Sequence, residues 1–329
     1  MKEKVLITGA SGFVGYHLVE AALRQGYEVY AAVRPTSDVR HLEAFSLHYT
    51  TLDFGNPEAL KKELEAKQYD YIIHGAGITR AKTQEDYNTV NAVYTRNLAA
   101  AVAGAAIPLK KFIFLSSLAA VGPTYYADTN PISAASVARP VTSYGKSKLL
   151  AEQYLDDIDV PRITLRPTAV YGPREKDIFI MFKTLKRGLE PYIGQKGQVL
   201  SFIYAEDLAH AVIRALQSET AGRTYNISDG GRYERYELAS LTKRILGAKT
   251  FRFHVPMGVV RLIASSMEAI YANSRNTPVL NREKLNELAA ENWYCSIEDA
   301  RRDLGFEPEY NLEAGLTRTL EWYKKNNWL

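Results

Sequence analysis

The chain has 329 residues, more than one compact core usually holds and enough for two lobes of about 150 residues each. Apolar residues make up 46% of the sequence and charged residues 24%, a globular mixture that excludes wholesale disorder. The net charge of +4 comes from interspersed acidic and basic residues, with no basic arm or acidic tail. We therefore expect no nucleic-acid partner.

The sequence also predicts no integral membrane segment, because its longest uncharged apolar stretch, Leu98–Leu109, is about half as long as a spanning helix. The opening residues, MKEKVLITGA, lack the basic and apolar regions of a signal peptide. The single cysteine, Cys295, excludes an intrachain disulfide, and the six histidines show no paired spacing typical of a metal site. We expect a cytoplasmic protein without a structural metal.

The first half of the chain alternates short runs of β-branched and aromatic residues with segments of helical periodicity. The predicted strands are Lys4–Thr8, Glu28–Val33, Tyr69–His74, Lys111–Ser116 and Arg162–Arg166. The predicted helices between them are Phe13–Gln25, Pro57–Lys67 and Asp86–Ala106. This alternation predicts the α/β class, with a Rossmann-like doubly wound parallel sheet covered by helices on both faces.

The rhythm changes after about Gly172, where predicted helices are joined by irregular connections rich in proline and glycine. These helices are Ile178–Arg187, Ala205–Gln217, Glu237–Leu246 and Leu312–Lys325. We expect a nucleotide-binding domain over residues 1–172, to which later segments return. Residues 173–329 are expected to form a smaller, mainly helical substrate-binding lobe.

A glycine-rich turn follows the first predicted strand in the pattern TGxxGxxG. Glycines allow a tight turn and a close backbone approach to a pyrophosphate, which then lies at the positive end of the next helix. A purely structural turn is the alternative, but the strand before the turn and the helix after it favour a dinucleotide site. The cofactor-binding candidates here are Gly9, Ser11, Gly12, Phe13, Val14 and Gly15.

The end of the second predicted strand bears on the choice of cofactor. It carries no acidic residue that could bind the adenosine ribose, and Arg34 follows it instead. A guanidinium can pair with a 2′-phosphate, and Ser37 and Arg40 lie close enough in sequence to contribute. The pattern favours NADP(H) over NAD(H), although Arg34 as a solvated surface arginine is the alternative.

The catalytic candidates are Tyr144, Lys148 and Ser117. Tyr144 and Lys148 are four residues apart at the start of a predicted helix, on one face, and Ser117 stands at the end of an apolar strand. A tyrosine has an unperturbed pKa near 10, and nearby positive charge favours its phenolate form. Tyr144 could then exchange a proton with a substrate oxygen that Ser117 holds.

With these motifs the sequence resembles the extended short-chain dehydrogenase/reductases, the NAD-dependent epimerase/dehydratase family, over nearly its whole length. The motifs are TGASGFVG, HGAG, NAVYTRN, YGKSK, LRPTAVYGP and FIYAEDLA. The resemblance implies a homodimer and the choice of Ser117 over Ser116 as the catalytic serine. It adds cofactor contacts at Asp53, Phe54, Ala76, Gly77, Asn91, Lys148, Pro167, Thr168 and Val170.

Departures from the family pattern separate the candidate reactions. Sugar dehydratases carry an Asp-Glu pair where this chain has Leu118 and Ala119, and nucleotide-sugar epimerases usually carry an arginine near Leu200 and Ser201. The segment VRPTS is similar to that of dihydroflavonol 4-reductases and hydroxysteroid dehydrogenases. We therefore expect an NADP(H)-dependent oxidoreductase that interconverts a ketone and a secondary alcohol on a steroid-, flavonoid- or lipid-like small molecule. The alternatives are a nucleotide-sugar epimerase with tightly bound NAD and a non-catalytic redox sensor or scaffold.

The segment Val255–Tyr271 is apolar on much of its circumference, with Arg261 and Glu268 as its only charges. Such a helix could line an apolar substrate pocket, lie against a membrane surface, or simply be core, which is the simplest interpretation. By resemblance, Tyr125, Tyr126 and Tyr204 fall near the cleft and are candidates for contact with substrate.

Overall fold

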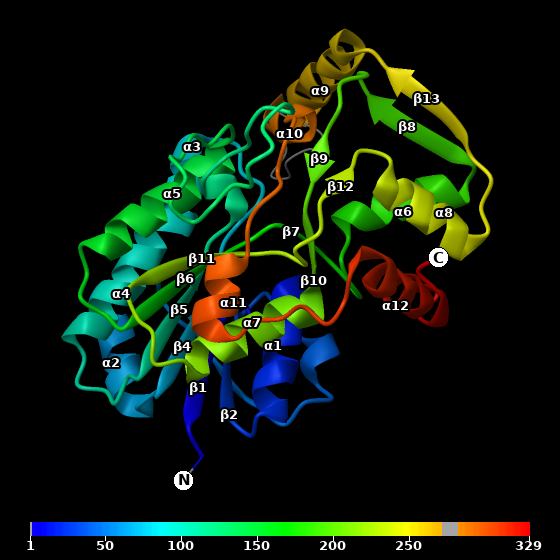
Figure 1. Cartoon of the computed structure of the whole chain (residues 1–329). Helices are drawn as coiled ribbons and strands as arrows, with labels where there is room; N and C mark the ends of the chain where they lie inside the picture. Colours follow the sequence, from blue (N-terminus) through cyan, green and yellow to red (C-terminus); the bar gives the residue numbers. More distant parts are fainter. Residues whose placement is uncertain (1, 272–281) are drawn as a thin grey trace.

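The computed structural model describes residues 2–271 and 282–329. Its centre is a seven-stranded sheet in the order β11-β6-β5-β4-β1-β2-β3, with every neighbouring pair parallel (Figure 1). The strands are β1 Lys4–Thr8, β2 Glu28–Ala32, β3 His48–Thr50, β4 Tyr71–His74, β5 Lys111–Leu115, β6 Arg162–Pro167 and β11 Arg223–Ile227. The strand order reverses direction between β1 and β4, and such a switch point leaves a ligand-binding crevice at the carboxyl ends of the strands.

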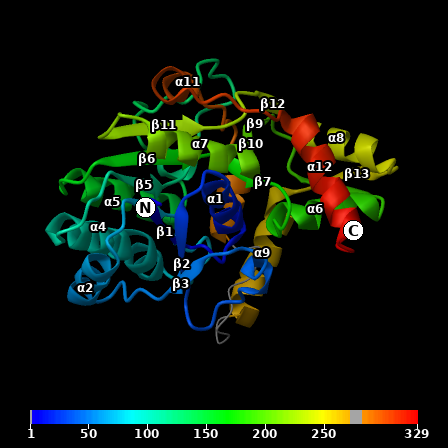
Figure 2. The same ribbon diagram turned by 90° about the horizontal axis from the view of Figure 1, so that it is seen from below.

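Helices cover both faces of the sheet, as the alternating pattern predicts (Figure 2). One face is covered by α1 Phe13–Arg24, α7 Ala205–Gln217 and α11 Glu298–Leu304. The other is covered by α2 Pro57–Lys67, α4 Tyr94–Gly104 and α5 Ser143–Asp156. The buried strands supply apolar side chains to both layers, so the α/β prediction is confirmed.

The segment predicted as a single helix over Asp86–Ala106 is divided in the structure. It comprises α3 Gln84–Asn88, a π-helical turn η2 over Thr89–Val93, and α4. Such turns insert an extra residue into a helix and often occur at functional sites. Here the turn carries Asn91, which lies fully buried behind the crevice.

The second lobe packs around its own aromatic core and combines helices with short strand pairs. Its helices are α6 Asp177–Lys186, α8 Glu237–Leu246, α9 Met257–Tyr271, α10 Arg282–Ala289 and α12 Leu312–Lys325. Its strands are β7 Ala169–Tyr171 with β10 Phe202–Tyr204, β9 Val199–Leu200 with β12 Tyr233–Glu234, and β8 Leu189–Ile193 with β13 Phe251–Val255. We predicted irregular connections in place of β8 and β13, and that prediction was wrong. Between these elements the chain returns to the large sheet through α7 and β11.

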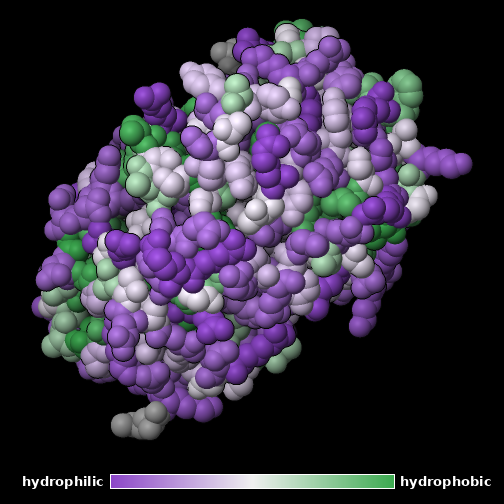
Figure 3. Space-filling model, in the orientation of Figure 1, coloured by the Kyte–Doolittle hydropathy of each residue, from purple (hydrophilic) through white to green (hydrophobic). Residues whose placement is uncertain are grey.

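The surface drawn in Figure 3 is largely hydrophilic, with scattered hydrophobic patches. Within residues 2–271 and 282–329, none of the helices has both the length and the apolar character that crossing a membrane requires.

Candidate active site

A cavity of about 930 Å³ lies at the carboxyl ends of the central strands, where the switch point predicts a crevice. The glycine-rich turn, the ends of β5 and β6 and the start of α5 form its walls. Many of the predicted site residues line it: Gly9, Ser11, Gly12, Phe13, Val14, Gly15, Arg40, Gly77, Ser117, Tyr144, Lys148, Pro167, Thr168 and Val170. Segments far apart in the sequence are thus brought together at one site.

The other predicted residues lie behind or beside this cavity. Arg34 and Ser37 form an exposed turn after β2, in which the Arg34 amide donates to Ser37 Oγ at 3.2 Å. Asp53 is exposed and accepts the Gly55 amide at 3.0 Å, while the Phe54 ring stacks on Tyr94. These side chains belong to the same edge of the sheet without lining the cavity wall.

The glycine-rich turn fits the pyrophosphate of a dinucleotide. Gly9 has a φ of +73°, and a Cβ there would lie 2.8 Å from the Gly75 carbonyl carbon. A Cβ at Gly15 would overlap the Gly9 carbonyl oxygen, so only glycine allows α1 to start so close to β1. The α1 N-terminus has no side-chain cap and no acidic residue in its first turn. Its free backbone amides, at the positive end of the helix dipole, therefore face the cavity.

The loop after β4 is held by buried polar side chains. Asn91 Oδ1 accepts the Ile78 amide at 2.8 Å, and Asn91 Nδ2 donates to the Ile78 carbonyl at 2.9 Å. The Ala76 amide donates to Thr8 Oγ1 at 3.1 Å, and Thr8 Oγ1 in turn contacts His74 Nδ1 at 2.8 Å. Asn91 and Ala76 therefore shape the loop that forms the cavity wall instead of lining it themselves.

His74 has a structural role, consistent with the absence of any chemical argument for it in the sequence. Its Nε2 contacts Thr95 Oγ1 at 2.9 Å, and burial lowers the pKa of the imidazole to about 3. At neutral pH the ring is uncharged, as its wholly buried position requires.

Tyr144, Ser117 and Lys148 come together where α5 begins. The first turn of α5 lies against the short helix after β5, and a Cβ at Gly145 would overlap the Ala119 carbonyl oxygen. This contact brings the Tyr144 phenol close to the Ser117 hydroxyl, which lowers the pKa of the phenol. The glycine of YGKSK is thus needed for the close approach, a requirement that we did not recognise in the sequence.

Electrostatics at this cluster are set mainly by burial. Burial raises the pKa of Tyr144 to about 12, against the lowering effect of the Ser117 hydrogen bond. Burial lowers the pKa of Lys148 to about 8, and the nearby Glu152 carboxylate opposes that shift. Lys148 Nζ donates to the Leu115 carbonyl at 2.7 Å and lies 4.8 Å from the centre of the Phe114 ring. At neutral pH the phenol keeps its proton and the lysine stays largely charged.

The two serines at the end of β5 have different partners. Ser116 is buried, and its hydroxyl donates to Glu152. Ser117 is half-buried, accepts the Ala119 amide at 3.2 Å and lies beside Tyr144. Only the Ser117 hydroxyl is therefore placed to share a substrate oxygen with the phenol.

A second cavity, of about 460 Å³, adjoins the first and shares Thr79, Tyr144 and Asp177 with it. Its apolar lining comes from α6, β8 and α10: Ile180, Met181, Leu185, Leu189, Pro191 and Leu288. Polar groups from Arg80, Asp177, Lys284 and Glu287 stand among these side chains. Tyr144 thus has its phenol between a cavity of dinucleotide size and a smaller, mainly apolar one. We did not predict these lining residues, because they depend on how α6 and β8 pack.

Three charged residues line another part of the large cavity: Arg40, which was predicted to bind the cofactor, Arg174, which could replace the arginine of the epimerases, and Asp38, which was not predicted. The Arg40 guanidinium donates two hydrogen bonds to the Asp38 carboxylate, from Nε to Oδ1 at 2.9 Å and from Nη2 to Oδ2 at 2.6 Å. The Arg174 guanidinium lies 4.3 Å from the centre of the Tyr16 ring and 5.3 Å from that of Trp322. Arg174 is held by rings from both lobes, so it is a fixed cation on the cavity wall.

Tyr204, Tyr125 and Cys295 lie outside both cavities. Tyr204, a predicted substrate contact, is buried in the core of the second lobe, so that prediction was wrong. Tyr125 is exposed and does not line either cavity. Cys295 is buried, and burial raises the pKa of its thiol to about 12, which makes it unreactive.

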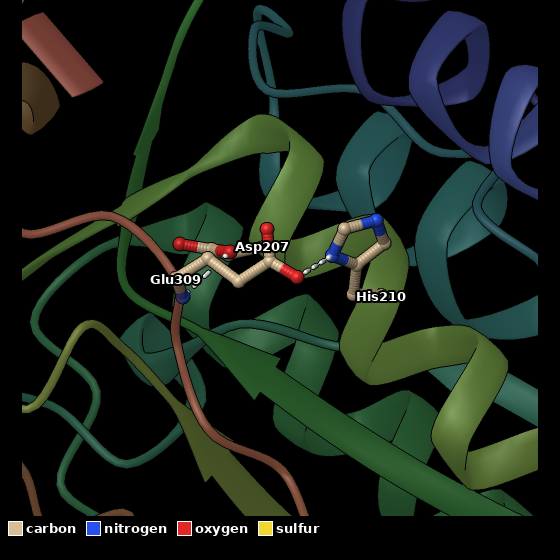
Figure 4. Close-up of side chains that lie close together, drawn as sticks. All are labelled: Asp207, His210 and Glu309. Atoms are coloured by element: carbon tan, nitrogen blue, oxygen red, sulfur yellow. Dashed lines mark hydrogen bonds and ion pairs between the residues drawn. The ribbon is translucent and has the colours of Figure 1, made fainter. Parts of the chain in front are cut away.

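The side chains of Asp207, His210 and Glu309 form a cluster (Figure 4). Each offers one atom that could bind a metal ion, and these atoms lie within 4.8 Å of one another. Asp207 already accepts the backbone amides of Glu309 and Tyr310, both at 3.0 Å. The buried carboxylate therefore fastens the segment before α12 to α7, and His210 contacts Glu309 at its exposed edge. We interpret the cluster as a structural tie between the chain's C-terminal part and the large sheet.

Residues 5–228 match the NAD dependent epimerase/dehydratase family. The ceramide reductase of Caulobacter vibrioides is 29% identical over 99% of this chain and 96% of its own length. The 2-alkyl-3-oxoalkanoate reductase of Stenotrophomonas maltophilia is 24% identical over 96% of this chain and 98% of its own. The UDP-glucose 4-epimerase of Thermotoga maritima, solved with UDP-glucose, has the same fold at a TM-score of 0.79 and 21% identity, covering 98% of this chain and 99% of its own. With the glycine-rich turn and the Ser-Tyr-Lys cluster in place, the chain belongs to the NAD-dependent epimerase/dehydratase family, the extended short-chain dehydrogenase/reductases, and is an NAD(P)-dependent enzyme.

Proposed function

We propose that this protein is an NADP(H)-dependent reductase that converts a ketone of an apolar, lipid-like small molecule into a secondary alcohol. The observation that carries the proposal is the smaller cavity, which is lined mainly by aliphatic side chains and borders the Tyr144 phenol. Two relatives that match over most of their length are named as reductases, one of a ceramide and one of an oxoalkanoate. Both names denote molecules that combine an oxygen function with apolar chains, and the mainly apolar lining of the cavity supports a substrate of that kind.

The bound nicotinamide would supply the hydride for the carbonyl carbon. Ser117 would hold the carbonyl oxygen by a hydrogen bond, and Tyr144 would donate its phenolic proton to that oxygen. Lys148 would hold the nicotinamide ribose and stabilise the phenolate left on Tyr144. A phenol that is protonated at neutral pH suits a reaction in which an alkoxide oxygen must receive a proton.

The remaining cofactor contacts are proposed by family resemblance. Asp53 and Phe54 would lie toward the adenine, Ala76 and Gly77 toward the ribose and pyrophosphate, and Pro167, Thr168 and Val170 beside the nicotinamide. Asn91 would act as a positioning residue, since its amide group is taken up by Ile78 and by Ser147 Oγ at 3.0 Å.

The preference for NADP(H) is proposed from Arg34, whose exposed guanidinium stands at the tip of β2 where many NAD-binding proteins carry an acid. Arg40 is already paired with Asp38, so Arg34 is the better partner for a 2′-phosphate. We expect Arg34→Ala to lower kcat/KM for NADPH about tenfold to a hundredfold, the effect of losing a charge-assisted hydrogen bond. The value for NADH should change less than about threefold, since NADH has no 2′-phosphate.

Steady-state kinetics with both cofactors measure this difference. Arg24→Ala removes an exposed arginine of α1 that pairs with Glu20, and it should leave both values unchanged. An equal loss with both cofactors in Arg34→Ala would contradict the assignment.

The substrate class is tested with a series of methyl ketones of increasing chain length, assayed with NADPH. Each added methylene that enters the apolar cavity should raise kcat/KM by about fourfold, which corresponds to about 0.8 kcal/mol of burial. The rise should stop when the cavity is filled. A flat series would contradict an apolar binding site.

The alternative, a nucleotide-sugar epimerase, makes the opposite prediction for UDP. In many epimerases a cation grips the diphosphate, but Ser201 at that place is buried and donates to the Gly231 carbonyl at 3.1 Å. In thermal-shift titrations with NADP⁺ present, we therefore expect no saturable effect of UDP. A saturable UDP shift together with a flat ketone series would establish the epimerase instead.

A further inference from the structure

Helix α9 presents its apolar residues to solvent instead of to the core. Only Val260 and Ala264 of this fifteen-residue helix are buried. Val259, Leu262, Ile263 and Ile270 recur at the spacing of one helix face and are exposed, Leu262 by 69% and Ile270 by 76%. The simplest sequence interpretation, that this segment is core, was therefore wrong for most of its apolar side chains.

The exposed side chains do not serve the substrate cavity directly. α9 packs on α10 through Val260, Ala264 and Leu285, and no residue of α9 lines either cavity described above. The strand β13, which leads into α9, adds another exposed apolar side chain, because Phe251 is 72% exposed and stacks on Phe253. We call Phe251, Val259, Leu262, Ile263 and Ile270 the docking surface.

The docking surface lies in a strongly basic part of the chain. Residues 183–193 and 243–271, which contain β8, β13 and α9, carry eight basic and two acidic residues. The basic residues are Lys183, Lys186, Arg187, Lys243, Arg244, Lys249, Arg252 and Arg261. Glu190, one of the two acids, is buried and pairs with Lys243 and Arg252, and Arg244 pairs with Glu313 of α12. The positive charge of the region is therefore carried mainly by Lys183, Lys186, Arg187, Lys249 and Arg261. Because the whole chain carries a net charge of only +4, this region is unusual in its excess of positive charge.

The apolar surface also continues to the mouth of the smaller cavity. Leu288 of α10, Ile180 of α6 and Leu189 of β8 line that cavity and are exposed at the same time. α9 packs on α10, so the docking surface lies next to the helix that carries Leu288 at the cavity entrance (Figure 1). In Figure 3, green side chains reach the surface over α9 and β13, at the top and upper right.

We propose that the docking surface binds the face of an anionic lipid bilayer. Apolar side chains that protrude from an amphipathic helix enter the boundary between headgroups and acyl chains, and nearby cations are attracted to anionic lipids. Docking would place the cavity entrance against the membrane, from which a lipid ketone could enter without crossing water. That purpose rests on the proposed function, whereas the binding itself does not.

The test is sedimentation of the full chain with vesicles of phosphatidylcholine alone and of phosphatidylcholine with phosphatidylglycerol. We expect binding to the anionic vesicles, weaker binding to the neutral ones, and weakening by salt. In Leu262→Ser/Ile270→Ser, the partition coefficient for anionic vesicles should fall about a hundredfold, roughly tenfold for each buried apolar side chain. Val137→Ser, which changes an exposed apolar residue outside α9 and β13, should bind as the unmodified protein does.

Activity on a short, water-soluble ketone should be unchanged in the double variant, since neither residue lines a cavity. Absence of binding to anionic vesicles would overturn the proposal. So would a double variant that binds vesicles normally, or a dimer that the double variant converts to monomers without any vesicle binding, which would assign the surface to a second copy of the chain. If no ketone is reduced but vesicle binding follows the expected pattern, the proposed function fails and the docking surface stands.

Discussion

Replacing Tyr144 with Phe is expected to lower turnover about 10²- to 10⁴-fold, the usual contribution of a positioned proton donor. The substitution removes one hydroxyl and keeps the ring. The edge-to-face contact with Tyr87, whose ring centre lies 6.5 Å from that of residue 144, is therefore retained, and so is the start of α5. The dissociation constant for NADP(H) should change little, because the phosphate-binding turn lies on other elements. Single-turnover assays and cofactor titration by fluorescence measure these two effects separately.

The pH profile gives a second readout of the same cluster. Burial lowers the pKa of Lys148 to about 8, so the ammonium is present below that pH and is lost as the pH rises through it. In the unmodified protein, kcat/KM for ketone reduction should therefore decrease above about pH 8. Any residual rate in Tyr144→Phe should lack this decrease, since there is no phenolate for Lys148 to stabilise.

Tyr154→Phe is the matched control, because Tyr154 lies on the same helix but packs against Arg96, away from both cavities. It should retain full turnover. Retained turnover in Tyr144→Phe would remove Tyr144 from the reaction, and a large loss of cofactor affinity would show that the variant acts through structure instead.

Replacing Arg166 with Met is expected to destabilise the fold by about 3–5 kcal/mol, the range for breaking a buried ion pair from one side. Arg166 of β6 donates to Glu152 of α5 through Nε at 3.0 Å and through Nη2 at 2.5 Å. Both side chains are buried, and Ser116 donates to the same carboxylate. Without its arginine, Glu152 would remain as a buried carboxylate with too few partners. The melting temperature of the Arg166→Met variant should fall by about 10 °C.

The double variant Arg166→Met/Glu152→Leu separates the loss of the pair from the loss of packing. Replacing both charges by apolar groups often restores most of the stability, so we expect the double variant to melt well above the single one. Arg24→Met, which breaks a surface ion pair with Glu20 at 2.9 Å, should cost less than about 1 kcal/mol. A loss of that small size in Arg166→Met as well would show that water or a rearranged side chain replaces the buried pair.

The sequence predicted five of the seven strands of the central sheet, because these five are largely buried and read as apolar runs. It did not predict the two edge strands, β3 and β11; β3 is only three residues long and largely exposed. The predicted bounds of α2, α7, α8 and α12 agree with the structure at both ends. The second lobe was harder to predict. Strand β13 alternates Phe251, Phe253 and Val255 with polar residues, but it is only five residues long. Its partner residues in β8 lie 62 positions earlier, too far away for a local pattern to connect the two strands.

The candidate site, like the fold, could be predicted from the sequence only in part. The motifs predicted the cavity wall, since each is a local feature at the end of a strand or at the start of a helix. The pairing of Asp38 with Arg40 and the clamping of Arg174 between Tyr16 and Trp322 depend on side-chain conformation and on contacts between distant elements. The exposure of α9 could not be predicted from the hydrophobic periodicity of the sequence. An apolar helix face shows the same spacing whether protein or another apolar medium covers it.

The repeated return of the chain to the large sheet limits how such an enzyme can evolve. α7 and β11 interrupt the second lobe in sequence, and Asp207 fastens the segment before α12 to α7. The second lobe is therefore not a continuous segment of the chain that recombination could exchange as a whole. New substrate ranges would instead arise piecemeal, by remodelling α6, β8 or α10 between anchor points that stay fixed. This would let members of one family act on very different molecules while the Ser-Tyr-Lys cluster keeps its geometry.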